Sequence, residues 1–121
     1  MAKVLIVDDE ASIRALLTVA FTKAGFDVSS AEDGSDAIDR INSERFDVVL
    51  SDVMMPRTNG HELVRWVAEN FPLLPTVLMS GFDAECEECP LASRCTLLSK
   101  PFLPKDAVSL IASMLNPKLV A

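Results

Sequence analysis

The chain has 121 residues, of which half are hydrophobic, and a formal net charge of −7 at pH 7. This length suits a single domain over residues 1–121 with a core of its own. The negative charge argues against direct nucleic-acid contact, because phosphate backbones attract basic surfaces. No apolar run approaches the ~20 residues of a membrane-spanning helix, and the amino terminus lacks the layout of a signal peptide. We therefore expect a cytoplasmic protein that does not contact a membrane.

Five short apolar segments, each followed by helix-forming sequence, predict an α/β fold. The first, residues 4–7, is continuously apolar, as in a strand that is covered on both faces. The other expected strands are residues 28–31, 46–51, 76–79 and 96–99. Strands that alternate with helices predict a parallel sheet with right-handed crossovers and helices on both faces. For five strands we expect a flavodoxin-like (βα)5 fold with the order 2-1-3-4-5.

Apolar residues at helical spacing lie between the expected strands. The first helix is expected to bury one face made of Ile13, Leu16, Leu17, Ala20, Phe21 and Ala24. Gly25 suits the carboxyl-terminal cap of this helix, because glycine adopts the left-handed conformation at little cost. Asp33 and Gly34 indicate a turn before the second helix. Pro104 suits the first turn of the last helix.

The two middle helices are less regular. The second and third helices are expected to bury apolar residues within 37–41 and 63–67. Residues 83–94 predict one short or irregular helix, because Pro90 limits its length.

Residues that can handle a phosphoryl group follow four of the five strands. Asp8 and Asp9 follow the first strand, Asp52 the third, Ser80 the fourth and Lys100 the fifth. The carboxyl ends of parallel strands share one edge of the sheet, which is where ligands bind in such folds. Three carboxylates in one pocket repel each other, so they need a cation, and Mg²⁺ or Mn²⁺ suits such oxygen ligands.

A carboxylate beside such an ion can attack an activated phosphorus and form an aspartyl phosphate. The protein then mainly positions groups and stabilises charge. The ammonium group of Lys100 could pair with one phosphoryl oxygen. The Ser80 hydroxyl and backbone N–H groups near Met54 and Gly81 could hold another.

Four motifs in this order resemble the receiver domain of two-component response regulators. They are Val7-Asp8-Asp9-Glu10, the segment from Ser51 to Pro56 with Gly60, Ser80-Gly81, and Lys100-Pro101-Phe102. The resemblance covers essentially the whole chain. It implies that Asp52 is the phosphoacceptor and that Asp8, Asp9, Asp52 and the backbone carbonyl of Met54 bind Mg²⁺. It also implies that Ser80 is the switch hydroxyl and Lys100 its charge partner.

The same resemblance implies a signalling switch rather than a conventional enzyme. The phosphoryl donor would be a phosphohistidine on a sensor histidine kinase or phosphotransfer protein. Phosphorylation would alter a surface around the fourth helix (within 83–94), the fifth strand (96–99) and the fifth helix (from Pro104). That surface would meet a downstream protein partner or effector domain, and a phosphorylation-dependent dimer is a further expectation.

Three positions depart from the usual receiver pattern. Leu97 stands where many receivers carry an aromatic residue that turns inward on activation, so we expect signal transmission by repacking instead. Met54 and Phe82 are large and apolar where receivers often carry polar residues that orient or admit water. We therefore expect a long-lived aspartyl phosphate.

Three cysteines, Cys86, Cys89 and Cys95, lie close together in the sequence. Three thiolates and a fourth ligand could hold zinc or sense redox state. The neighbouring glutamates disfavour the thiolate form, and no histidine lies close in sequence. A reduced, inert thiol cluster and a single adventitious disulfide remain alternatives.

Three other functions are compatible with a fold of this kind. An aspartyl-nucleophile phosphohydrolase would require a second acid two residues after the nucleophile, where Met54 stands. A flavin-binding electron carrier would require a Ser/Thr/Gly-rich phosphate loop after the first strand, where the sequence has acids. A receiver that docks partners without being phosphorylated is opposed by the intact set of acids and lysine.

Overall fold

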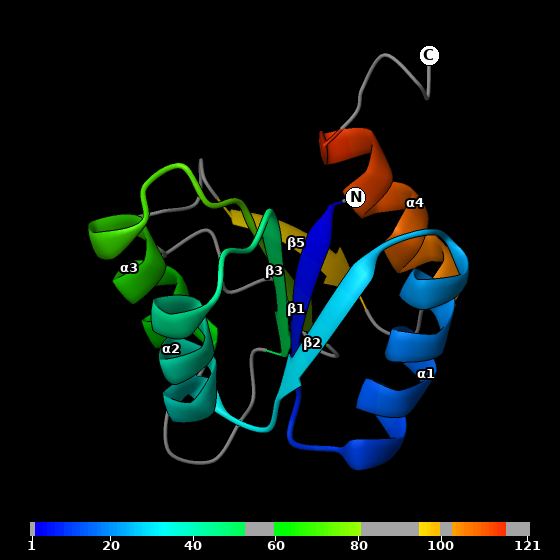
Figure 1. Cartoon of the computed structure of the whole chain (residues 1–121), viewed down its shortest axis with the longest axis horizontal. Coiled ribbons are helices and arrows are strands. Elements are labelled where there is room, and N and C mark those ends of the chain that lie inside the picture. The colour runs from blue at the N-terminus through cyan, green and yellow to red at the C-terminus, as the bar shows by residue number, and fades with distance from the viewer. Residues whose placement is uncertain (1, 53–59, 81–94, 100–102, 116–121) are drawn as a thin grey trace.

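The computed structural model describes residues 2–52, 60–80, 95–99 and 103–115 of the chain, which form strands and helices in alternation (Figure 1). The strands are β1 (Lys3–Val7), β2 (Asp27–Ala31), β3 (Val48–Asp52), β4 (Thr76–Ser80) and β5 (Cys95–Ser99). The helices are α1 (Ala11–Lys23), α2 (Gly34–Ser43), α3 (Gly60–Asn70) and α4 (Pro104–Leu115).

All five strands belong to one parallel sheet with the order β2-β1-β3-β4-β5. The parallel α/β architecture and this strand order agree with the prediction from the sequence. The helix expected within residues 83–94 lies outside the described residues. The structure therefore does not test the full (βα)5 count, and the helix labelled α4 is the fifth helix of the sequence prediction.

Helices cover both faces of the sheet, as predicted. In Figure 1, α1 and α4 lie on one side of the strands and α2 and α3 on the other. The residues of β1 and β3 alternate between two apolar clusters, so these two strands contribute to both layers of the core. The first cluster contains Val4, Ile6, Leu17, Phe21, Val48, Leu50, Val77, Met79, Ala107 and Ile111. The second contains Leu5, Val7, Ala31, Ala37, Ile41, Phe46, Val49, Leu63 and Val67.

The carboxyl-terminal end of α1 has the cap predicted for Gly25. Gly25 has a φ of +94°, which a side chain would disfavour. Its N–H donates to the carbonyl of Thr22 and the N–H of Phe26 donates to the carbonyl of Phe21, which is a Schellman motif. The rings of Phe21 and Phe26 pack edge to face at 5.1 Å between centroids, so the apolar contact typical of this motif is also present.

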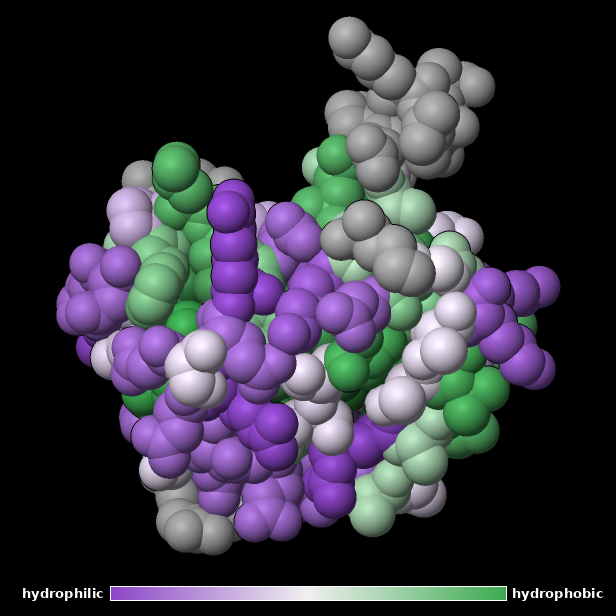
Figure 2. All heavy atoms as spheres, viewed as in Figure 1, coloured by the Kyte–Doolittle hydropathy of each residue, from purple (hydrophilic) through white to green (hydrophobic). Residues whose placement is uncertain are grey.

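The prediction of the buried face of α1 was wrong at two positions, Leu16 and Ala24, which are both exposed. Leu17 is 1% exposed and Phe21 is fully buried, but Leu16 is 57% exposed and Val19 is 53% exposed. Leu16 lies at the border of the apolar stripe, whose centre runs through Leu17 and Phe21, and the sheet covers only the centre. Apolar surface is accordingly visible over α1 at the right of the molecule in Figure 2.

The amino-terminal ends of α2 and α4 are fixed by acids. Asp33, predicted as part of a turn, is the N-cap of α2 and accepts a hydrogen bond from the N–H of Asp36 at 2.8 Å. Pro104 is the first residue of α4, as predicted. Asp106 accepts a hydrogen bond from the N–H of Leu103 at 3.0 Å, which is half of a capping box.

None of the four described helices has both the length and the apolar character that a membrane span requires.

Candidate functional site

The candidate site lies where β1 and β3 end. In the pairing of these neighbouring strands, Val7 lies opposite Ser51. Asp8 and Asp52 are therefore each one residue further along, at the same edge of the sheet. Asp52 is the last residue of β3 and lies opposite Met79 of β4.

Three carboxylates meet at this edge. Oxygen atoms of Asp8, Asp9 and Asp52 all lie within 4.8 Å of one another. Asp8 is fully buried, Asp52 is 6% exposed, and Asp9 is exposed. We call these three residues the acid cluster. The predicted convergence of acids from the first and third strands is present in the structure.

Hydrogen bonds fix the chain on either side of Asp8. The N–H of Asp8 donates to the carbonyl of Ala31 in the neighbouring strand β2 at 3.1 Å. The Oδ1 of Asp8 accepts from the N–H of Glu10 at 2.9 Å. The carbonyl oxygen of Asp8 accepts from Nη1 of Arg14 at 2.5 Å. Asp8 is thus bonded through its N–H, its carboxylate and its carbonyl.

The acid cluster also lies next to the amino-terminal end of α1. That helix begins at Ala11, has no acid in its first turn, and receives no side-chain cap from Glu10. The helix dipole gives this end a partial positive charge, which favours nearby carboxylates. The dipole and Arg14 together offset part of the repulsion among the three acids.

The donor set fits a hard divalent cation. Two buried carboxylates next to a third, exposed one are costly to hold together unless a positive charge compensates them. Mg²⁺ prefers oxygen ligands, needs only a few from the protein, and keeps several waters. Asp8 and Asp52 supply buried oxygens, and the exposed Asp9 leaves the site accessible to those waters.

The remaining predicted site residues are described only in part. Ser80 is the last residue of β4 and lies opposite Ser99 of β5 in the backbone pairing, so its backbone reaches the same edge of the sheet. Lys100 follows Ser99 directly in sequence but lies outside the described residues, as do Met54 and Phe82.

Two further predictions concern β5 and the cysteines that precede it in the sequence. Leu97 and Cys95 belong to β5, where their backbones lie opposite Leu78 and Thr76. Cys86 and Cys89 lie outside the described residues, so the structure does not decide among the alternatives for the cysteines.

Analysis of the sequence did not identify Arg14 as part of the site. The sequence offered one signal for such a role: Arg14 is a basic residue in the early turns of a helix, where the helix dipole disfavours positive charge. The hydrogen bond of Arg14 goes to a backbone carbonyl, and no sequence pattern indicates a bond of this kind.

A network of charged residues lies at the opposite, amino-terminal edge of the sheet. Nζ of Lys3 lies 2.6 Å from Oε1 of Glu44, which also accepts from the hydroxyl of Ser29 at 3.2 Å. Nη1 of Arg40 lies 3.7 Å from Oε2 of Glu44. The hydrogen bond from Lys3 lowers the pKa of Glu44 and, reciprocally, raises the pKa of Lys3. This network is remote from the acid cluster, at the other end of β1.

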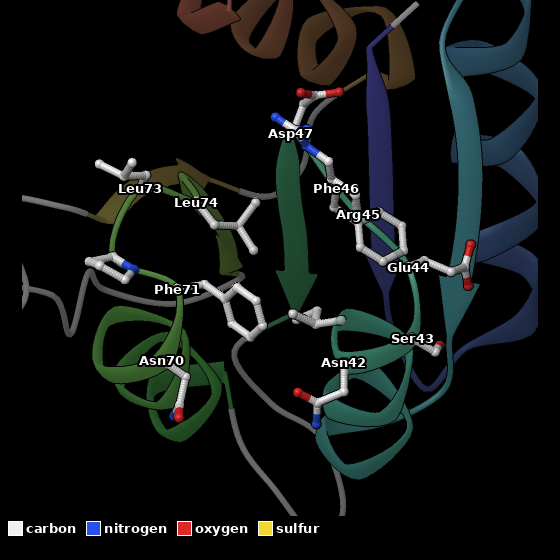
Figure 3. A pocket seen from close by; sticks show the side chains of 12 residues that line it. Asn42, Ser43, Glu44, Arg45, Phe46, Asp47, Asn70, Phe71, Leu73 and Leu74 are labelled. Carbon is white, nitrogen blue, oxygen red and sulfur yellow. The ribbon is translucent and has the colours of Figure 1, made fainter.

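A hollow in the described part of the chain also lies at this amino-terminal edge. It has a volume of about 650 Å³ and lies between the ends of α2 and α3. Figure 3 shows Phe71 and Leu74 pointing into it from one side, with Phe46 on the other. None of the predicted site residues lines this hollow, so it is separate from the acid cluster.

Comparison with known proteins identifies the class. The sequence profile of the response regulator receiver domain matches residues 4–112. The chain therefore belongs to the family of response regulator receiver domains.

Individual relatives agree with this assignment. The chain is 34% identical over 119 residues to the response regulator receiver protein CpdR of Brucella abortus, covering 95% of this chain and 98% of that protein. It is 29% identical to the alkaline phosphatase synthesis transcriptional regulatory protein PhoP of Bacillus subtilis, of which it spans half. The solved structure of the chemotaxis protein CheY4 of Vibrio cholerae is similar, with a TM-score of 0.86 and 32% identity over 95% of this chain and 99% of that one.

Proposed function

We propose that this chain is a phosphorylation-controlled signalling switch of a two-component system. It accepts a phosphoryl group on Asp52 from a phosphohistidine of a sensor histidine kinase or phosphotransfer protein. The observation that carries the proposal is the acid cluster, whose oxygens lie within 4.8 Å of one another at the carboxyl edge of the sheet. Membership of the receiver family supports the same reading over a hydrolase or a flavin carrier.

The proposed reaction is a displacement at phosphorus. A carboxylate oxygen of Asp52 attacks the phosphorus, a new P–O bond forms, and the P–N bond to the donor imidazole breaks. The released imidazole nitrogen takes up a proton from water. Asp52 is only 6% exposed, so little bulk water has to be displaced from its side chain when the donor arrives.

Mg²⁺ or Mn²⁺ is the cofactor that we propose for this site. Asp8, Asp9, Asp52 and the backbone carbonyl of Met54 would hold the ion, which would neutralise negative charge when the phosphoryl group approaches. Lys100 would pair with a phosphoryl oxygen, and the Ser80 hydroxyl would move toward another. Both follow from the resemblance to the family.

The phosphoryl group adds roughly −1.5 to −2 charges to the site at neutral pH. We propose that this biases two arrangements of the surface around the helix expected within 83–94, β5 and α4, and that Leu97 repacks between them. A downstream protein partner or effector domain reads that surface, with phosphorylation-dependent dimerisation as one outcome. The switch is not a conventional enzyme, does not contact nucleic acid or membrane itself, and acts in the cytoplasm.

Intact mass spectrometry tests the proposal. The protein is incubated with acetyl phosphate, with and without Mg²⁺. We expect a mass gain of one phosphate that requires the cation and is absent in Asp52→Asn. Asp39→Asn, which removes an exposed acid from α2, is the matched control and should be phosphorylated like the wild type. The absence of a mass gain in the wild type, or its persistence in Asp52→Asn, would refute the proposal.

A further inference from the structure

We infer that Arg14 is a positioning residue, whose bond to the Asp8 carbonyl holds the turn that presents Asp8 and Asp9 to a cation. The inference rests on the proposed function only in naming Mg²⁺ as the ion. The contact that carries it is the hydrogen bond from Nη1 of Arg14 to the backbone oxygen of Asp8, in a part-buried setting.

The turn is held from two directions. On one side, the carboxylate of Asp8 accepts from the N–H of Glu10, which draws the chain into a tight bend. On the other side, Arg14 reaches back from α1 to the carbonyl of the same residue. The backbone N–H of Arg14 also donates to the carbonyl of Glu10 at 3.1 Å. Asp8 and Glu10, at the two ends of the bend, are therefore both hydrogen-bonded to Arg14.

The helix dipole disfavours a basic residue at the position of Arg14, although the acid cluster nearby favours one. A cation in the early turns of a helix faces the positive end of the helix dipole. In the part of the chain that the structure describes, the Asp8 carbonyl is the one acceptor of the Arg14 guanidinium. Guanidinium has a planar, rigid set of donors, which fixes an acceptor more firmly than a flexible ammonium does. A role in ordering the turn accounts for a basic residue at this place.

Arg14 acts on cation binding in two opposite ways. Its positive charge repels a second cation at the acid cluster, so removing the charge alone should tighten Mg²⁺ binding. Its hydrogen bond orders the turn before the ion arrives, so removing the bond should weaken Mg²⁺ binding. We infer that the second effect dominates, because residues that orient metal ligands typically change affinity by about 10- to 100-fold. The sign of the change therefore distinguishes the two effects.

The experiment measures Mg²⁺ affinity of the unphosphorylated protein by calorimetry for the wild type, Arg14→Met and Arg14→Lys. Arg45→Met is the matched control, because Arg45 is exposed at the opposite edge of the sheet and its loss changes the net charge equally. We expect about tenfold weaker binding in Arg14→Met and wild-type binding in Arg45→Met. The affinity of Arg14→Lys should lie between these two values, because an ammonium group keeps the charge and can donate but lacks the rigid guanidinium geometry.

Hydrogen exchange provides a second readout that needs no ion. The amide of Glu10, which is bonded to Asp8, should exchange about tenfold faster in Arg14→Met than in the wild type. Amides in the middle of α2 should be unchanged. If Arg14→Met fails to fold, Arg14→Gln, which keeps an N–H donor on a shorter side chain, replaces it in both measurements.

Three outcomes would overturn the inference. Tighter Mg²⁺ binding in Arg14→Met that fades at high salt would show that Arg14 acts through charge alone. A lower melting temperature with unchanged Mg²⁺ affinity would show a purely structural role. Equal weakening in Arg45→Met would show a nonspecific effect of net charge. If the wild type binds Mg²⁺ but acetyl phosphate does not modify it, the proposed function fails while the role of Arg14 still stands.

Discussion

At the scale of single residues, the fold brings three mutually repelling carboxylates together in the acid cluster. Asp8 and Asp52 are buried and Asp9 is exposed, with their oxygens within 4.8 Å. Like charges at such distances repel by about 1 kcal/mol in water and more in a protein interior. Without a cation the folded state therefore carries this repulsion, which is relieved in the unfolded chain.

Replacing one acid should consequently stabilise the protein in the absence of divalent ions. We expect Asp9→Asn to raise the free energy of unfolding by about 1 kcal/mol without Mg²⁺. We also expect it to lose most of the stabilisation that Mg²⁺ gives the wild type, since ligands stabilise the state that binds them. Thermal denaturation with and without Mg²⁺ measures both effects, with Asp39→Asn as control. A lower stability of Asp9→Asn without Mg²⁺ would contradict the repulsion argument.

The lifetime of the phosphorylated state is a second residue-scale prediction. Met54 and Phe82 flank the site in sequence, and large apolar side chains there should hinder the attack of water. We expect the double variant Met54→Asn, Phe82→Glu to lose the phosphoryl group severalfold faster than the wild type. The decay of the phosphorylated mass after removal of the donor measures this rate. Equal decay in both proteins would show that these side chains do not control access of water.

The sequence predicted the acid cluster because strand ends are visible as apolar runs followed by acids. It predicted Asp52 and Asp8 as neighbours because the flavodoxin-like order expected for five strands places the first and third strands side by side. Arg14 and Glu44 were missed for a different reason. Their contacts, to a backbone carbonyl and to a side chain 41 residues away, have no local pattern.

At the scale of secondary-structure elements, α1 shows what the spacing of apolar residues can and cannot predict about the buried face of a helix. Apolar spacing predicted that this helix packs on the sheet, and Leu17 and Phe21 do so. Spacing could not predict the width of the buried face, because that depends on how closely the sheet and α4 approach. Leu16 was therefore assigned to the core although more than half of it is exposed.

Leu16 and Leu17 provide a matched pair for testing this burial. We expect Leu17→Ala to lower the free energy of unfolding by about 2–5 kcal/mol, because it removes atoms from a close-packed core. Leu16→Ala should change it by less than about 0.5 kcal/mol, as is usual for surface positions. Urea denaturation of both variants measures the difference. Similar losses in the two variants would mean that the outer face of α1 is covered in solution.

At the scale of the whole molecule, the parallel sheet separates two kinds of polar residue. Acids that can hold a cation lie at the carboxyl edge, and the contacts of Lys3 and Glu44 lie at the amino edge. The latter tie the first strand to the segment between α2 and β3, and so contribute to the stability of the fold. The family profile spans residues 4–112, and a single domain over residues 1–121 stays a prediction.

The ion pair between Lys3 and Glu44 makes a contribution to stability that depends on pH. The pKa of Glu44 is lowered from its ordinary value of 4.5, so its contribution is present above that value and is lost as the pH falls through the lowered pKa. The pKa of Lys3 is raised from 10.5, so its contribution is lost only as the pH rises beyond that value.

We therefore expect Glu44→Gln to be less stable than the wild type at neutral pH, and the difference to shrink as the pH falls below about 4.5. Chemical denaturation at a series of pH values measures it. Glu69→Gln, which changes an exposed glutamate on α3, should show no such trend. A difference between wild type and Glu44→Gln that is constant down to low pH would contradict the role of this ion pair.

The exposed Leu73 next to the amino-edge hollow has a practical consequence. Its side chain is 96% exposed, and it lies at the edge of the sheet opposite the acid cluster. A fluorescent dye or an immobilisation tether attached there, through an unnatural amino acid, would leave the carboxylates untouched. Such a conjugate would allow cation binding and partner binding to be followed on a sensor surface, with the acid cluster facing the solution.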